Sequence, residues 1–492
     1  MSQYMDDQWT EGSGPELLSK DPLDQELIWS GREASTEQAH QVIQISKDRF
    51  FSWSHTSFEQ REEIMKNYGR VLNHKKDELA LLISKEMGKP LWESLTEVQA
   101  MIAKVDLSIK AHLDRCGERR QSLEDALSIT RFHPIGVCLI LGPFNLPAHL
   151  PNGHLIPALL AGNTVILKPS EKTPAVGEWM MRALIQAGLP NGVVQLLQGG
   201  IALSQSLVQS HDINIIAFTG SYQAGAAIHK ACSGYPEKML ALEMGGNNPL
   251  VIWDTSKISL AAYSTILSSY ITSGQRCVCA RRLIVPEGPL GDALIKRLSN
   301  MMKGIQVKTW DKRPEGFIGP LIDEQAGINV LNAQDKAIDS GATSHVLSTT
   351  IYEHPAMLSP SLLEWEDHEV YKQTMEDHEI FGPLLQVFRV PSFEKAVDLA
   401  NDTNYGLAAG LISDKKERWE YFHHHVRAGI TNWNRQITGA LSSAPFGGVG
   451  HSGNFRPSAY FASDYCSYPS ASIEVEELKK PANTMTGLEI DL

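Results

Sequence analysis

The sequence predicts an α/β protein whose first half forms a parallel, Rossmann-like sheet, and three observations lead to this class. Short apolar segments alternate with helical segments of about 10–15 residues between 135 and 246, as in βαβ units. Apolar residues recur at three- and four-residue spacing over residues 34–115. A second alternation of strands and helices runs from residue 247 to about 435.

The segment 34–115 is predicted to be helical. Two stretches within it begin with Ser or Thr followed by Glu or Gln, a pattern typical of a helix N-cap; they read ASTEQAHQ and SFEQREE. The sequence GKP at 88–90 then predicts the end of the second helical run.

The parallel sheet is predicted from continuous apolar strands, which are typical of sheets covered on both faces. Their sequences are IGVCLILGPF, TVILKPS, GVVQLLQGG, INIIAFTGS and MLALEMGG. Right-handed crossovers between them would make the sheet Rossmann-like. In the second region we expect strands at NPLVIWD, ARRLIVPE and GITNWN, a helix at KISLAAYSTILSSYITSGQ, and a Gly-rich loop at APFGGVGHSGN.

The composition excludes several classes of protein. The 492 residues carry a net charge of −13, so we expect no attraction to nucleic acid. The first thirty residues hold no secretory signal, and no segment reaches the roughly 20 apolar residues of a membrane helix. Six cysteines are too few for a disulfide scaffold. We therefore expect reduced thiols in a cytoplasmic protein without a membrane partner.

The segment ITSGQRCVCARRL, residues 271–283, places Cys277 and Cys279 beside three arginines. Zinc needs about four ligands, and no matching Cys/His pair lies nearby, so we predict no metal. A disulfide between the two cysteines would be strained. Two interpretations of the segment remain open: a buried core strand and a reactive thiol. The arginines favour the thiol, because nearby cations lower a thiol pKa from roughly 8.5.

Two further segments lie at the ends of predicted strands. This is the edge at which open α/β sheets bind ligands. In FTGSYQAG, the residues Gly220, Ser221 and Gly225 would let a backbone approach a phosphate at a helix N-terminus, although an ordinary turn explains them equally well. In ILKPSEKTP, Lys168 and Glu171 would bind the ribose of an adenine nucleotide, or they are solvated turn residues. A carboxylate there would repel a 2′-phosphate, which favours NAD over NADP.

The segment ALEMGGNNP ends another apolar strand with Glu243. Burial would raise the pKa of this carboxyl toward the range of a general base, whereas a Glu turned to solvent is the alternative. Together with Cys277 it specifies one chemistry. A thiolate adds to an aldehyde, hydride leaves the thiohemiacetal for a nicotinamide, and water hydrolyses the thioester.

The chain resembles the NAD(P)-dependent aldehyde dehydrogenase superfamily over almost its whole length. Eight motifs occur in the order of that family: GPFNLP, KPSEKTP, FTGS, LEMGGNNP, GQRC, EIFGPLL, NYGLAAG and PFGGVGHSG. The resemblance implies Cys277 as nucleophile, Glu243 as base for thioester hydrolysis, and Asn145 as oxyanion-hole donor. It implies that NAD is held by the following residues: Lys168, Glu171, Gly220, Ser221, Gly225, Glu379 and Phe381. Cys279 is expected only to pack.

The sequence departs from the superfamily pattern at three positions. Asn247 replaces a common Lys, and Phe144 and Leu146 replace Trp and Phe. The stretches HLPNGHLIPALLAGN, QRCVCARRL and NWNRQITGALSSAPFGGVGHSGNFRPSA resemble one branch of the family. The branch acts in arginine degradation on a semialdehyde with two carboxylates. Another carboxylated semialdehyde, or a silent structural role, is the alternative.

An acidic chain needs local cations to hold such a substrate. The candidates are Arg276, Arg435 and Arg456, and hydroxyl groups can also bind a carboxylate; these belong to Thr438, Ser442 and Ser443.

The resemblance also implies three structural units. These are an NAD-binding domain from 1–115 and 137–246, a catalytic domain from 247–440, and an oligomerisation arm from 116–136 and 458–492. The arm would pair subunits into a homodimer or homotetramer.

Overall fold

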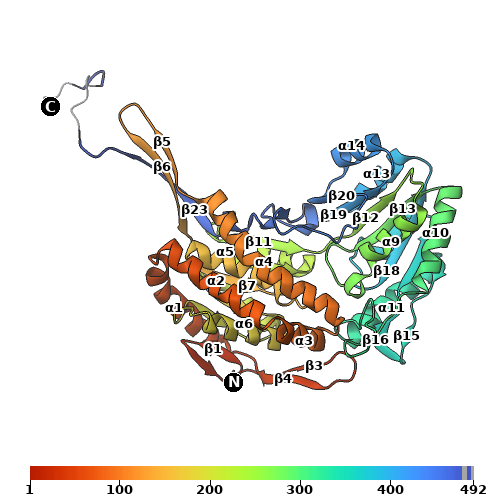
Figure 1. Cartoon of the computed structure of the whole chain (residues 1–492), viewed down its shortest axis with the longest axis horizontal. Coiled ribbons are helices and arrows are strands. Elements are labelled where there is room, and N and C mark those ends of the chain that lie inside the picture. Colours follow the sequence, from red (N-terminus) through yellow and green to blue (C-terminus); the bar gives the residue numbers. More distant parts are fainter. Residues whose placement is uncertain (479–484, 489–492) are drawn as a thin grey trace.

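The computed structural model describes residues 1–478 and 485–488, and two seven-stranded sheets form its two lobes (Figure 1). A third, three-stranded sheet projects from the body. The predicted α/β class is confirmed. No helix in the described part of the chain is long and apolar enough to cross a membrane.

The first sheet has the order β11-β10-β7-β8-β9-β1-β2, and the strands from β11 to β9 run parallel. The antiparallel strands β1 and β2 extend it, an addition that the acidic, Gly/Pro-interrupted N-terminus did not predict. The strand bounds are β1 (Gln3–Met5), β2 (Gln8–Thr10), β7 (Val137–Leu141), β8 (Thr164–Lys168), β9 (Val194–Leu196), β10 (Ile215–Gly220) and β11 (Met239–Met244).

Helices cover both faces of this sheet because its strands are apolar on both faces. Alternate residues of β7 show it: Cys138 and Ile140 pack against the group α2–α6, whereas Leu139 and Leu141 pack with α1 and α7. The predicted capping boxes are present at Ser35 and Ser57. The helices are α1 (Thr36–Ser54), α2 (Phe58–His74), α3 (Lys76–Met87), α4 (Leu91–Cys116), α5 (His149–Ala161), α6 (Pro174–Gln186), α7 (Ile201–Gln209) and α8 (Tyr222–Ala231).

The second sheet has the order β14-β17-β18-β13-β12-β19-β20 and is parallel except for β14. Its strands are β12 (Asn248–Ile252), β13 (Ala280–Pro286), β14 (Thr343–Val346), β17 (Ser361–Trp365), β18 (Leu384–Val390), β19 (Ala408–Ile412) and β20 (Ile430–Trp433). Its helices are α9 (Ile258–Ser269), α10 (Pro289–Met302), α11 (Glu324–Asp339), α12 (His368–Met375), α13 (Phe393–Asn401) and α14 (Lys416–His425).

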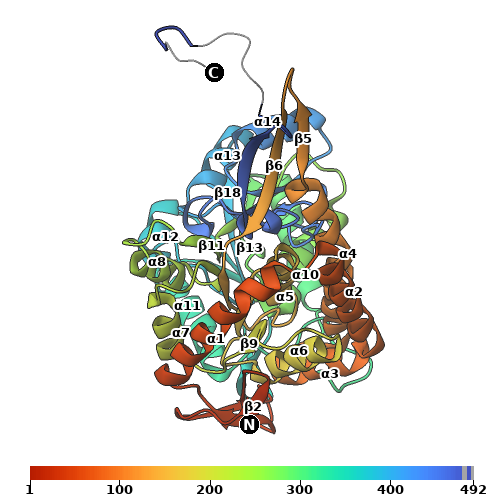
Figure 2. The ribbon, with the colours of Figure 1, turned by 90° about the vertical axis from the view of Figure 1, so that its left-hand side faces the viewer.

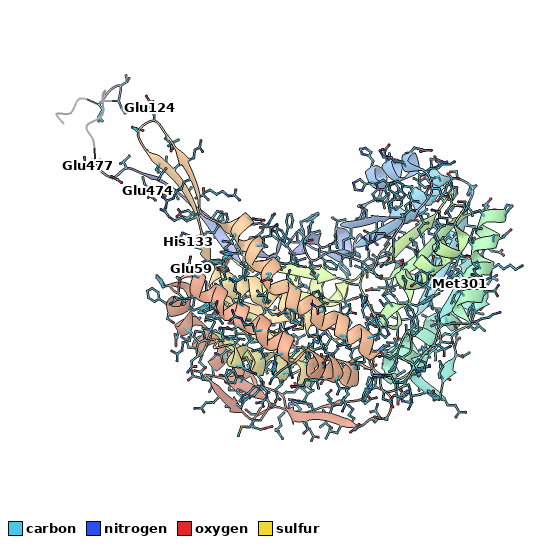
Figure 3. All side chains as sticks on the ribbon, viewed as in Figure 1. Glu59, Glu124, His133, Met301, Glu474 and Glu477 are labelled. Carbon is cyan, nitrogen blue, oxygen red and sulfur yellow. The ribbon has the colours of Figure 1, made fainter. Side chains whose placement is uncertain are left out.

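The projecting sheet pairs the hairpin β5 (Arg119–Ser122) and β6 (Leu127–Pro134) with β23 (Ser467–Glu474). Figure 2 shows the three strands running together away from the body, and Figure 3 places Glu124 at the hairpin tip. Residues 479–484 and 489–492 of the predicted arm lie outside the described residues.

Short elements complete the chain, and some lie inside the predicted arm segment. Residues 458–465 form β22 and η3. These elements pack against α4 and α5 of the body and do not join the projecting sheet. The short elements are β3 (Glu16–Lys20), β4 (Leu27–Arg32), η1 (Ile271–Gly274), β15 (Thr350–Ile351), β16 (His354–Leu358), β21 (Pro445–Phe446), η2 (Gly450–Ser452), β22 (Ser458–Ala459) and η3 (Ala462–Tyr465).

Candidate active site

The carboxyl ends of four parallel strands meet at one edge of the first sheet. Leu141 pairs with Lys168 across β7 and β8, and Thr219 pairs with Glu243 across β10 and β11. Ligands of open α/β sheets bind outside this edge. The parallel register therefore brings together segments that the sequence separates by about a hundred residues.

The thiol-bearing loop lies between η1 and β13, and the backbone of η1, which leads into it, is unusual. Thr272 and Ser273 have φ of 57° and 54°, a left-handed conformation that L-residues rarely adopt in succession. The Ser273 hydroxyl donates to the Gly319 carbonyl at 2.6 Å, and the Thr272 hydroxyl donates to the buried Glu93 carboxylate. These bonds hold a backbone that would otherwise relax, as is common at functional sites.

Asn248 positions Cys277 from the second sheet. Its side-chain amide donates to the carbonyls of Cys277 and Cys279 at 2.7 and 2.8 Å, and its oxygen accepts from the Ala408 amide at 2.9 Å. This residue was not predicted from the sequence, although it lies within the motif LEMGGNNP. The two cysteines thus share one backbone clamp, but their side chains differ: Cys279 is buried and Cys277 is partly exposed.

Cys277 lies where two cavities meet. The cavity on the side of β10 and α8, about 320 Å³, is called the first-sheet cavity below; the other, about 310 Å³, is called the α4–α5 cavity. Both are lined by Asn145, Thr219, Glu243 and Cys277. A molecule in either cavity therefore has access to the thiol.

Asn145 lies directly beside the thiol loop. Its side chain is buried and donates one hydrogen bond to the Gln275 carbonyl at 2.9 Å. An amide nitrogen carries two donors, so one N–H remains for an oxygen in the cavity. A spare donor on the wall of the cavity is what an oxyanion-hole residue must offer.

Glu243, the fifth residue of β11, is buried beside both cavities. One oxygen accepts from the Ser458 amide at 3.2 Å, and Oε2 has no hydrogen-bond partner among the described residues. Burial raises the pKa of Glu243 to about 8. A carboxyl of this kind can accept a proton near neutral pH.

The arginines do not activate the thiol as the sequence predicted. Arg276 forms an ion pair with Glu93 at 2.8 Å, and Arg281 donates to the Gly274 carbonyl at 2.7 Å and to Glu379 at 3.2 Å. Arg282 is buried and donates to four backbone carbonyls, those of Asn247, Leu399, Ala400 and Asp402.

The thiol pKa therefore moves in the opposite direction to the prediction. Burial raises the pKa of Cys277, and the carboxylates of Glu379 and Glu243 raise it further, against a smaller lowering by Arg281. The sequence showed that cations were present but not that carboxylates from distant segments neutralise them.

The first-sheet cavity collects several residues predicted to hold the cofactor. Gly220 ends β10, Ser221 caps α8 by accepting from the Ala224 amide at 3.2 Å, and Glu379 and Phe381 lie on the opposite wall. Gly225 does not line the cavity but lets α8 pack against Met244, whose sulfur would be 2.3 Å from an added Cβ.

Lys168 and Glu171 lie outside the lining of this cavity, next to Ser170, which belongs to it. Lys168 is buried and donates to the carbonyls of Pro169 and Gly199 at 2.9 and 2.6 Å. Glu171 is 3.8 Å from the ammonium, and its side chain is 40% exposed. It remains accessible to a ribose hydroxyl.

The α4–α5 cavity includes only some of the predicted substrate residues. Arg276, Thr438 and Ser442 line it. Arg435 and Ser443 do not: both are exposed and lie outside its wall, so the structure does not place them at the substrate side of Cys277.

Arg456 lines a different pocket, of about 250 Å³, with Leu242 and Gly447. Which residues of the loop line the α4–α5 cavity depends on its folded path, which the sequence did not reveal. Among the described residues, no group of three or more His, Cys, Asp or Glu side chains is arranged to hold a metal ion.

Comparison with known proteins identifies the family, because the aldehyde dehydrogenase family matches residues 9–469. The chain belongs to the aldehyde dehydrogenase family. This confirms the resemblance noted from the eight ordered motifs.

Several relatives of similar length carry the same name. The N-succinylglutamate 5-semialdehyde dehydrogenase of Legionella pneumophila (strain Paris) is 45% identical over 489 residues, covering 99% of this chain and 98% of the relative. The protein of that name from Ectopseudomonas mendocina (strain ymp) is 44% identical, covering 99% of this chain and 100% of the relative. The one from Chromobacterium violaceum is 42% identical and covers 99% of each chain.

Solved aldehyde dehydrogenases have the same fold. The 1-pyrroline-5-carboxylate dehydrogenase from Thermus with bound NAD superposes with a TM-score of 0.89 at 26% identity, covering 96% of this chain and 92% of that one. An NADP-dependent glyceraldehyde-3-phosphate dehydrogenase from Bacillus halodurans, complexed with NADP, gives 0.89 at 25% identity and covers 96% and 98%. The family fold therefore accommodates both nucleotides.

Proposed function

We propose that this enzyme oxidises N-succinyl-L-glutamate 5-semialdehyde to N-succinyl-L-glutamate with NAD, in arginine degradation. The observation that carries the reaction type is the position of Cys277, which lies where two cavities meet and beside Asn145 and Glu243. The names of three relatives at 42–45% identity over nearly full length support the substrate.

In this proposal Cys277 attacks the aldehyde carbon. Its thiol holds its proton in the resting state, because burial and two carboxylates raise its pKa. The proton leaves for solvent as the C–S bond forms, so Glu243, on the wall that both cavities share, stays unprotonated for the later hydrolysis. The aldehyde oxygen becomes an alkoxide within reach of the free N–H of Asn145, which stabilises its charge.

Loss of hydride converts the thiohemiacetal on Cys277 to a thioester. Glu243 then removes a proton from the water that attacks the thioester carbon, and the C–S bond breaks to release the acid and the thiol. The unpartnered Oε2 of Glu243 is the acceptor that this step needs, and its pKa of about 8 matches a base working near neutral pH.

The first-sheet cavity fits a nicotinamide nucleotide. Thr219 Oγ1 is buried there without a hydrogen-bond partner among the described residues, and the cavity includes the N-terminus of α8, which suits a phosphate. When bound, NAD accepts the hydride. Gly220 and Ser221 would hold its pyrophosphate, Lys168 and Glu171 its adenosine ribose, and Glu379 and Phe381 its nicotinamide ribose; Gly225 supports the turn.

The projecting sheet supports a homo-oligomer, either a homodimer or a homotetramer, because β5 and β23 leave edges to which another subunit can add. A cytoplasmic location is part of the same proposal, and it agrees with six free cysteines.

Steady-state kinetics test the substrate. We expect kcat/KM for N-succinylglutamate 5-semialdehyde to exceed that for succinate semialdehyde, glutamate semialdehyde and pentanal by at least roughly 100-fold, since each of those aldehydes lacks one or both of its carboxylates. Equal or better turnover of a simple aldehyde would reject the assignment.

A further inference from the structure

The α4–α5 cavity contains a positive charge that no acidic side chain neutralises. Lys104 on α4 lines the cavity and is 2% exposed. Within the described chain its ammonium has neither a carboxylate within ion-pair distance nor a hydrogen-bond acceptor.

The acidic residue of α4 and the arginine that line the same cavity are already paired. Glu97 accepts from the amides of Ala148 and His149 at 3.0 Å each and forms an ion pair with Lys89. Arg276 is bound to Glu93 at 2.8 Å. Lys104 is therefore the ammonium or guanidinium of this wall that stays available to a ligand.

Burying an ammonium without a partner is unfavourable, and burial accordingly lowers the pKa of Lys104 to about 8. A substantial fraction of the side chain is still charged at neutral pH. His154 next to it gives no compensation, because burial and the lysine lower the pKa of His154 to about 3. Burying an aliphatic residue here would cost less free energy than burying an ammonium. The charge therefore points to an anionic ligand.

The position of Lys104 indicates which part of a ligand it reaches. Thr96, Glu97, Ala100 and Lys104 form one lining face of α4. Lys104 lies eleven residues beyond Glu93, the partner of Arg276, which is about 16 Å along the helix at about 1.5 Å per residue. The backbone of Lys104 therefore lies at the end of the α4 face farther from the thiol loop.

We propose that Lys104 binds the substrate carboxylate farthest from the aldehyde, the terminal carboxylate of the succinyl group, and so determines specificity for the succinylated substrate. This inference rests on the proposed function. An extended molecule with its aldehyde at Cys277 points its tail along the α4 face, and three N–H donors of an ammonium suit a carboxylate.

The test compares two aldehydes that differ at this carboxylate: N-succinylglutamate semialdehyde and N-acetylglutamate semialdehyde. We expect wild-type enzyme to prefer the succinyl compound, and Lys104→Met to reduce the ratio of the two kcat/KM values roughly 10- to 100-fold, chiefly through KM. The exposed Lys110→Met, on the same helix, is the matched control and should leave the ratio unchanged.

Two outcomes overturn the inference, and they are distinguishable. If wild type prefers the succinyl compound and Lys104→Met keeps that preference, Lys104 does not bind the succinyl carboxylate. The proposed substrate would then still stand. If wild type shows no preference, both proposals fail.

Folding is checked by the melting temperature. It should not fall in Lys104→Met, because an unpaired buried charge is removed. Should that variant fail to fold, Lys104→Gln takes its place in the same two-substrate comparison.

Discussion

The two cavities that meet at Cys277 are built differently. The first-sheet cavity is formed by strand ends, a helix N-terminus and Gly-rich turns, all of which occur as short motifs. The α4–α5 cavity is formed by the sides of two helices and by the loop from Thr438 to Phe446. The first can be recognised from local sequence, whereas the second depends on which face each helix presents.

This difference assigns separate tasks to the two sides. Backbone groups at strand ends suit a cofactor that many enzymes share. Side chains on helix faces can change without disturbing the sheet, so they suit the selection of one aldehyde. Mutations on the wall common to both cavities should abolish the reaction, whereas those on one side should change only what that side binds.

The largest effect is expected at the shared wall. Cys277→Ala should reduce kcat by at least about 10⁴-fold, because no covalent intermediate forms, while NAD binding measured by fluorescence titration stays within about threefold. Cys279→Ala is the control and should retain activity within about tenfold. If Cys277→Ala kept substantial activity, the nucleophile would have to be another residue.

The next effect also concerns the shared wall. Glu243→Gln should slow hydrolysis of the thioester about 10²- to 10³-fold and leave the first burst of NADH intact in stopped-flow traces. In wild type the carboxylate is the active form, so the hydrolysis rate should rise with pH through about 8 and then level off. That pH dependence should disappear in Glu243→Gln; if it persists, another group is the base.

The smallest effect is expected on the cofactor side alone. Glu171→Gln should reduce the preference for NAD over NADP about tenfold, since a carboxylate no longer repels the 2′-phosphate, with little change in specificity among aldehydes. Glu237→Gln, an exposed position of the same lobe, serves as control. A wild-type enzyme that turns over NADP better than NAD would contradict the role of Glu171.

The sequence predicted the fold class and most strands, because continuous apolar runs and capping boxes are local signals. It also brought out Cys277, Glu243 and Asn145, which lie in short ordered motifs. It failed for the arginines, since Glu93 and Glu379, which pair with Arg276 and Arg281, lie far away in the chain. No sequence pattern shows such pairing.

Lys104 was missed for a related physical reason. It lies within a helical segment, MIAKVDLSIK, where a lysine normally faces solvent, as Lys110 does. Only the packing of α4 against α5 turns it inward. Asn248 was missed because its role depends on hydrogen bonds to the backbone carbonyls of a distant loop, which no local sequence pattern shows.

The raised pKa of the Cys277 thiol also bears on how long the enzyme survives. Peroxides and alkylating agents attack the thiolate, and a site that keeps the proton on sulfur slows both reactions. A nucleophile that ionises only as an aldehyde arrives is spared damage between turnovers. Cellular oxidants would then inactivate the idle enzyme slowly, and catalytic lifetime would be limited by events during turnover.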